Sequence, residues 1–173
     1  MLAIPTAGRF AMSRPTLRLL LSHPAHFLSL GLGSGLSPVA PGTIGTLLAW
    51  AIYALIRPPF SDLGFGIFVL LGFVAGCFFV PLTGKALGVV DHGGIVWDEF
   101  IAIWLVLWLA PAGLWWQVVS VVLFRFFDIL KPWPIRVADV RFKNGFGVMF
   151  DDLLAAGYSL LCLAAAARFL VFA

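Results

Sequence analysis

The sequence predicts an all-α integral membrane protein that folds as a polytopic helical bundle. Of its 173 residues, 62% are hydrophobic and only 11% are charged, with a mean hydropathy of +1.06. Soluble domains carry about 25% charged residues. The apolar residues gather in four blocks, at residues 44–56, 63–83, 100–123 and 153–172. Since a spanning helix needs about 20 apolar residues, the length suits one domain of several helices.

The N-terminal residues 1–29 are predicted to form an interfacial segment, ahead of a membrane-embedded domain over residues 30–173. Two histidines and Pro24 interrupt the apolar stretch 17–30, so no signal-peptide core is present. Three arginines would hold the segment on the cytoplasmic surface. They are Arg9, Arg14 and Arg18.

The third apolar block is predicted to be a broken or re-entrant helix pair. Most acidic residues fall in or beside two connections, residues 84–99 and 125–152, and the second is also rich in Lys and Arg. A single crossing by the block between them would place these connections on opposite faces, against the positive-inside tendency. Pro111 and Gly113 divide the block into two runs too short for straight spans. A turn there returns both connections to the cytoplasm.

Two segments combine acids with a helix boundary. Residues 91–100 read Asp-His-Gly-Gly-Ile-Val-Trp-Asp-Glu-Phe, and residues 125–134 read Arg-Phe-Phe-Asp-Ile-Leu-Lys-Pro-Trp-Pro. The first indicates either helix capping or a metal site at a helix start. The second indicates either a local ion-pair ladder or a metal ligand between phosphate-binding cations, with the helix ending near Lys131 because Pro132 follows.

Two further segments are rich in glycine. Residues 144–152 are predicted to be a turn that ends in paired acids before the last helix. Because neighbours on a helix diverge by about 100°, we expect only one acid of each adjacent pair to face a common centre. Residues 33–46 supply either a plain helix cap or free N–H groups that bind phosphate oxygens.

Taken together, the acids favour magnesium-assisted phosphoryl chemistry, because carboxylate oxygens are ligands that Mg²⁺ prefers. The sequence lacks a Walker P-loop and an Asp-x-Asp-x-Thr stretch. Cys77 and Cys162 lack the spacing of a zinc site or a disulfide framework. The net charge of +3 suits an anionic lipid surface better than nucleic acid. An ion-coupled transporter or channel that uses the acids is the alternative, although the acids lie at block ends.

Four motifs, in this order, resemble the phosphatidylglycerophosphatase A family. They are Gly-Ser-Gly-Leu-Ser-Pro-Val-Ala-Pro-Gly-Thr at 33–43, Ile-Val-Trp-Asp-Glu-Phe at 95–100, Phe-Arg-Phe-Phe-Asp-Ile-Leu-Lys-Pro-Trp-Pro-Ile at 124–135 and Gly-Val-Met-Phe-Asp-Asp at 147–152. The resemblance covers about residues 30–165, with Ala102 where a glycine is expected. It implies Mg²⁺-dependent hydrolysis of phosphatidylglycerophosphate to phosphatidylglycerol and phosphate, at the cytoplasmic side of a bacterial inner membrane, in phospholipid biosynthesis.

Carried onto this chain, the resemblance implies a set of metal-binding and catalytic carboxylates, which are Asp98, Glu99, Asp128, Asp151 and Asp152. Asp91 and His92 are additional catalytic candidates, His92 either as a proton acceptor or only as a hydrogen-bonding partner. The expected substrate-binding residues are Lys131, Arg125, Arg136, Ser37 and Thr43. Both attack by water and an aspartyl-phosphate route remain open, and the sequence does not indicate an oligomeric state.

Overall fold

The computed structural model describes residues 14–171, and every regular element in that range is a helix. The predicted all-α class is therefore confirmed for this part of the chain. Residues 1–13, with Arg9 and the start of the predicted interfacial segment, lie outside the described residues. The elements are α1 Leu17–Ser22, α2 Pro24–Ser29, the 3-10 helix η1 Gly31–Leu36, α3 Pro41–Ile56, α4 Asp62–Leu87, α5 Trp97–Leu109, α6 Leu114–Leu130, α7 Ile135–Arg141 and α8 Gly145–Val171.

Helix α5 forms the centre of the molecule. Of its 13 residues, 10 are buried, on all sides of the helix. It packs against α3, α4, α6 and α8. A helix that is apolar all round is stable only when it is enclosed, so the neighbouring helices surround α5 and fix the position of its first turn.

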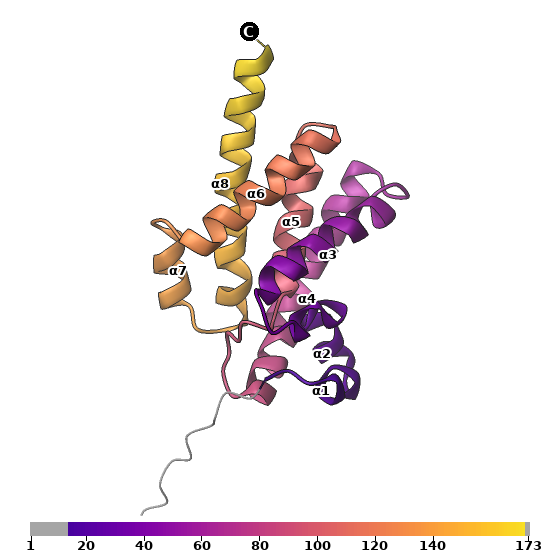
Figure 1. Ribbon diagram of the computed structural model, residues 1–173, viewed down its shortest axis with the longest axis vertical. Helices are drawn as coiled ribbons and strands as arrows, with labels where there is room; N and C mark the ends of the chain where they lie inside the picture. The colour runs from indigo at the N-terminus through magenta and orange to yellow at the C-terminus, as the bar shows by residue number, and fades with distance from the viewer. Residues whose placement is uncertain (1–13, 172–173) are drawn as a thin grey trace, which may run out of the picture.

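The chain breaks where Pro111 and Gly113 predict a break. Helix α5 ends at Leu109, Ala110 is extended, and Gly113 has a φ of +119°, which favours glycine. Helix α6 then returns along the bundle in contact with α5. Figure 1 shows this turn and the α3–α4 turn lying toward the end of the molecule where α8 finishes.

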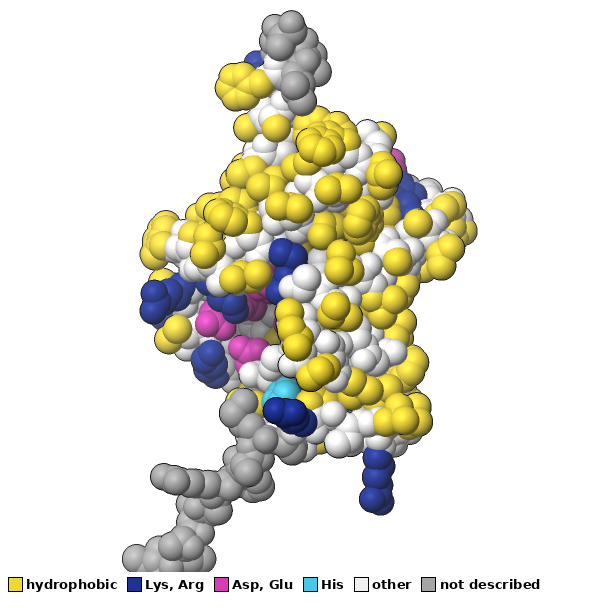
Figure 2. Space-filling view, in the orientation of Figure 1, with side chains coloured by type: hydrophobic (Ala, Val, Ile, Leu, Met, Phe, Trp, Pro, Cys, Tyr) yellow, Lys and Arg dark blue, Asp and Glu magenta, His cyan; other side chains and the backbone are white. Residues whose placement is uncertain are grey.

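Two helices, Asp62–Leu87 and Gly145–Phe169, are long and apolar enough to cross a bilayer, and Pro41–Ile56 is a shorter apolar helix. Apolar side chains cover much of the surface in Figure 2. Exposed Leu70, Leu71 and Phe78 on α4 are examples. These features fit a membrane protein, because the same residues would be poorly placed against water.

The last helix begins earlier than the predicted start at residue 153. Helix α8 starts at Gly145, so the paired acids lie in its second turn rather than in a turn before it. Asn144 Oδ1 accepts a hydrogen bond from Gly147 N–H at 2.9 Å, which caps the new helix start. The Asn and Gly residues that suggested a turn therefore form the helix cap, and the helix that follows contains the acids.

Gly145 allows α8 to approach α4 closely. Pro81 lies inside α4 and has no N–H to offer the carbonyl of Cys77, four residues earlier. A Cβ atom on Gly145 would lie 2.3 Å from that carbonyl oxygen and 2.4 Å from Pro81 Cγ. The proline and the glycine together therefore determine where α8 starts against α4.

We predict that Gly145→Ala lowers the stability of the protein by roughly 1–3 kcal/mol, because the added methyl would collide with rigid backbone. Gly157→Ala is the matched control, since a Cβ there meets nothing within 4 Å, and it should leave stability unchanged or raise it by up to about 1 kcal/mol. Thermal unfolding in detergent measures both. Equal midpoints for the two variants would refute this account of the α4–α8 contact.

Candidate active site

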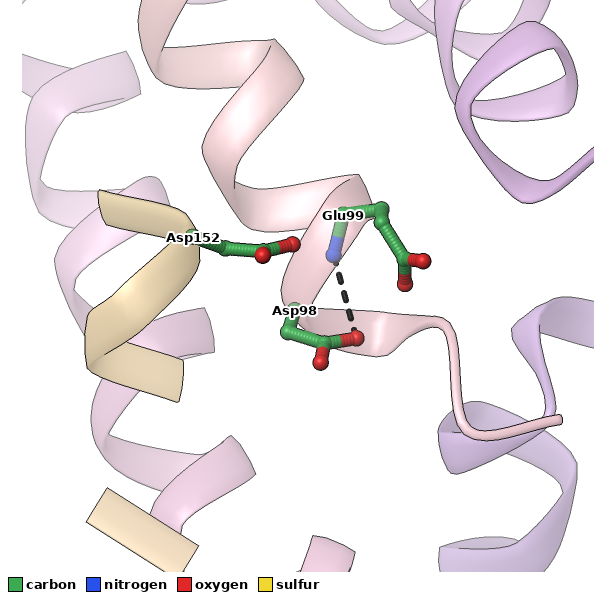
Figure 3. A group of neighbouring side chains, drawn as sticks. All are labelled: Asp98, Glu99 and Asp152. Atoms are coloured by element: carbon green, nitrogen blue, oxygen red, sulfur yellow. Dashed lines mark hydrogen bonds between the residues drawn. The ribbon is translucent and has the colours of Figure 1, made fainter. Parts of the chain in front are cut away.

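Three carboxylates from two helices meet inside the bundle. Asp98 and Glu99 lie in the first turn of α5, and Asp152 lies in the second turn of α8. One oxygen from each lies within 4.8 Å of the others, and all three residues are buried. Figure 3 shows Asp152 extending from α8 toward the start of α5, where Asp98 and Glu99 lie. Among the described residues this is the group whose geometry could hold a metal ion.

The expectation that only one acid of each adjacent pair would face a common centre is wrong for the first pair. Asp98 and Glu99 both belong to the group. Asp98 Oδ1 accepts a hydrogen bond from the Glu99 N–H at 3.1 Å, which holds it at the helix start. The extra methylene of Glu99 lets its carboxylate reach the same space. For the second pair the expectation holds, because Asp152 joins the group whereas Asp151 bonds to Lys131.

The group contains polar atoms without hydrogen-bond partners. Within the described part of the chain, buried Glu99 Oε2 and Asp152 Oδ2 have none. An unsatisfied buried polar atom costs about 1–3 kcal/mol, and more when it is charged. Buried carboxylate oxygens that face each other without a donor are the donor set that a hard divalent cation requires. The residues present therefore fit a magnesium ion.

Arg125 and Asp128 of α6 lie beside this group. Arg125 Nη1 lies 2.6 Å from Asp128 Oδ2 and 3.5 Å from Glu99 Oε1. These are ion pairs by distance, but the N–H bonds of Nη1 and Nε are not aligned with an acceptor. Asp128 also interacts with Asp152 through its side chain. Arg125 thus brings buried positive charge to the carboxylates.

Lys131 lies at the end of α6, at the edge of the acidic group. Its ammonium lies 2.5 Å from Asp151 Oδ2 and 3.2 Å from Asp139 Oδ1. Burial alone would lower the pKa of Lys131, but the bond and charge of Asp151, and then the charge of Asp139, raise it above its ordinary value. Its φ of 43° is one that glycine adopts more easily. The lysine is therefore held, charged, in a position where its backbone is strained.

The first turn of α3 also borders the acids. A Cβ on Gly42 would lie 2.2 Å from Glu99 Oε1 and about 3 Å from both terminal nitrogens of Arg125. Only a residue without a side chain leaves room for that ion pair. The segment 33–46 was singled out for its N–H groups, but its sequence gave no signal that Gly42 would contact Glu99. Thr43 follows Gly42 in the same turn and is half-buried.

The other predicted residues do not belong to the carboxylate group. Ser37 Oγ donates to Val39 O at 2.8 Å, and His92 Nδ1 accepts from Gly94 N–H at 3.0 Å, so each supports its own loop. Both line a separate cavity of about 490 Å³. Burial lowers the pKa of His92, and the charge of Asp91 opposes that shift. Exposed Asp91 interacts electrostatically with Asp151, and the catalytic role of this pair stays a prediction.

Two features of α7 complete the surroundings. Arg136 lines a cavity of about 640 Å³ that Lys131 also lines. Asp139 binds Lys131 and lies 3.7 Å from Lys143 Nζ. Sequence reasoning did not include Asp139 in the site. The spacing of four residues between Asp139 and Lys143 was the signal that could have indicated an ion pair there. Figure 2 shows acidic side chains in a hollow with Lys and Arg around it.

Known proteins match most of this chain. A family model described as phosphatidylglycerophosphatase A matches residues 27–167. A Haemophilus influenzae protein named phosphatidylglycerophosphatase A is 43% identical over 150 residues, covering 86% of this chain and 92% of the relative. An Escherichia coli K12 protein of the same name is 41% identical over 150 residues, covering 80% of each chain.

A Bacteroides thetaiotaomicron protein, provisionally named a phosphatidylinositol-3-phosphatase, is 38% identical over 148 residues, covering 80% of this chain and 91% of the relative. No solved structure shows a significant match to this chain. The family match spans all four motifs and every carboxylate of the site. The chain belongs to the phosphatidylglycerophosphatase A family, a family of phosphoric monoester hydrolases.

Proposed function

We propose that this protein hydrolyses the phosphomonoester of phosphatidylglycerophosphate, giving phosphatidylglycerol and inorganic phosphate, and that Mg²⁺ is required. Family membership supports the reaction class. The observation that carries the proposal is the buried group of Asp98, Glu99 and Asp152, in which two carboxylate oxygens have no partner among the described residues. In a bacterial cell this reaction would complete phosphatidylglycerol synthesis.

The names of the relatives support the proposed substrate class. Both named activities act on a phosphomonoester carried by a polyol, which a phosphodiester joins to diacylglycerol. The polyol is glycerol in one and inositol in the other. We assign glycerol to this chain, because the family model and the relatives at 43% and 41% identity agree on it.

Asp98, Glu99 and Asp152 are the proposed direct metal ligands, with Asp128 and Asp151 at the margin of the same group. These five carboxylates have two neighbouring cations, Arg125 and Lys131, so negative charge is in excess. Mg²⁺ would offset that excess and, when bound, polarise the phosphoryl group of the substrate. Asp128 and Asp151 would keep the two cations oriented toward the reacting phosphate.

Arg125 and Lys131 are the proposed phosphate-binding side chains. Arg125 Nε and Nη1 are buried and have no aligned acceptor among the described residues, which supports a role for this guanidinium in holding phosphoryl oxygens. The first turn of α3, at Gly42 and Thr43, adds backbone N–H groups and the positive end of a 16-residue helix. Holding the phosphate between these donors would orient it for in-line displacement and stabilise the charge that develops.

We propose that the protein is a multi-pass protein of the bacterial inner membrane with its active site facing the cytoplasm. The two long apolar helices support membrane insertion. The turn at residues 110–113 supports a re-entrant α5–α6 pair. The start of α5 carries Glu99, and the end of α6 returns to the same place, where Arg125 pairs with Glu99. The transporter or channel alternative has no support among the named relatives.

We predict that Asp98→Asn and Asp151→Asn each reduce phosphate release from phosphatidylglycerophosphate by at least about a hundredfold, with helical content unchanged. Asp62→Asn is the matched control, since Asp62 is exposed and pairs with Arg57 at the α3–α4 turn, and its activity should equal wild type. Phosphate release in detergent with and without a chelator measures the effect. Full activity in the first two variants would end the metal-site proposal.

Single-cysteine labelling tests the membrane orientation. In a background with Cys77 and Cys162 replaced by alanine, we predict that Gly93→Cys and Lys143→Cys react with an impermeant thiol reagent only from the cytoplasmic side. Gly93 suits this test because a Cβ there has open space. Pro59→Cys, in the α3–α4 turn, should react only from the opposite side. Labelling of positions 93 and 143 from different sides would refute the re-entrant pair.

A further inference from the structure

The cavity beside α7 is lined by both positively charged and apolar side chains. Its volume is about 640 Å³, and its lining includes Lys131, Trp133, Arg136, Val137, Val140 and Arg141. On a helix, Arg136 shares a face with Val140, and Val137 shares a face with Arg141, because the members of each pair are four residues apart. Both arginines are exposed, and neither has a carboxylate partner among the described residues. The cavity therefore offers two free guanidinium groups to an anion.

The apolar part of this lining suits a lipid more than a soluble anion. Trp133 is 78% exposed and Val140 is 64% exposed. Tryptophan at the surface of a membrane protein is typical of the headgroup level of the bilayer. Arginine beside it can bind a phosphate while its carbon stem contacts apolar atoms.

The cavity adjoins both the acidic group and a second, apolar groove. Lys131 contacts Asp151 on one side and lines the cavity on the other. Trp133 also lines the cavity, and its carbonyl oxygen accepts a hydrogen bond from the hydroxyl of Tyr158 at 2.9 Å. Tyr158 also lines a groove of about 600 Å³ along α8, with Leu153, Leu154, Gly157, Leu161 and Ala164. The groove runs along a helix long enough to cross the membrane.

We propose that Arg136 and Arg141 bind the phosphodiester of the lipid substrate, and that the groove on α8 receives an acyl chain. This inference rests on the proposed function, because the order of the sites follows the order of groups in the substrate. The phosphomonoester lies at the carboxylates, the diester phosphate in the arginine cavity, and the acyl chain parallel to α8. The two arginines thereby select a diacyl lipid that carries a second phosphate over a soluble phosphomonoester.

The test is the double variant Arg136→Gln/Arg141→Gln, assayed on phosphatidylglycerophosphate in detergent micelles. We expect KM to rise about a hundredfold, roughly tenfold for each charge-assisted hydrogen bond lost, with kcat nearly unchanged. Competitive inhibition by phosphatidylglycerol, which retains the diester, should weaken by a similar factor. Inhibition by inorganic phosphate, which occupies the monoester position, should stay unchanged. Arg18→Gln, which removes an exposed arginine of α1, should behave as wild type.

Three results would overturn the proposal. The first is an unchanged KM in the double variant. The second is a loss of inhibition by inorganic phosphate as large as the loss for phosphatidylglycerol, which would place the arginines at the monoester site. The third is weaker phosphatidylglycerol binding with unchanged hydrolysis, which would indicate a site for bulk lipid.

A binding measurement separates this inference from the proposed function. Native mass spectrometry compares how much phosphatidylglycerol and how much diacylglycerol stay bound to wild type and to the double variant. We expect wild type to prefer phosphatidylglycerol and the double variant to lose that preference. If wild type released no phosphate from phosphatidylglycerophosphate, the proposed function would be wrong, and this comparison would still decide whether the arginines bind a phosphodiester.

Discussion

The main physical constraint on this structure is the electrostatic repulsion between carboxylates that are buried together near the starts of two helices. Asp98 and Glu99 lie in the first turn of α5, and Asp152 approaches them from α8. Like charges in a medium of low dielectric constant repel strongly, and burial also removes their hydration. Arg125 and Lys131 offset part of this cost. The remaining excess of negative charge, together with two unpartnered oxygens, is why we assign a divalent cation to this position.

The fold maintains this arrangement by enclosing α5 and by limiting where α8 can start. Because α5 is buried on nearly all sides, its first turn cannot move away from the acids opposite. The contact between Gly145 and the Cys77 carbonyl positions the start of α8, and therefore the acids in its second turn. The α5–α6 turn brings Arg125 and Asp128 back to the same end of the bundle. Residues far apart in the sequence thus share one site because helix ends converge there.

Sequence reasoning could predict the helical class and the break near Pro111, because each depends on local composition. Its motifs also contained the three carboxylates that the structure brings together. It misplaced the start of α8, since Asn144 and the two glycines after it resemble a loop but instead cap a helix. It also missed the contact between Gly42 and Glu99, and the place of Asp139 beside Lys131. Such contacts depend on tertiary packing, and a single sequence carries no periodic signal for them.

The most direct test of the central claim is to locate the cation experimentally. Crystals grown with Mn²⁺, an ion that oxygen ligands also bind and that scatters X-rays anomalously, would give an anomalous difference map. Our account predicts a peak about 2.0–2.3 Å from carboxylate oxygens of Asp98, Glu99 and Asp152. A fully occupied Mn²⁺ site elsewhere, with these three carboxylates pointing apart, would contradict it.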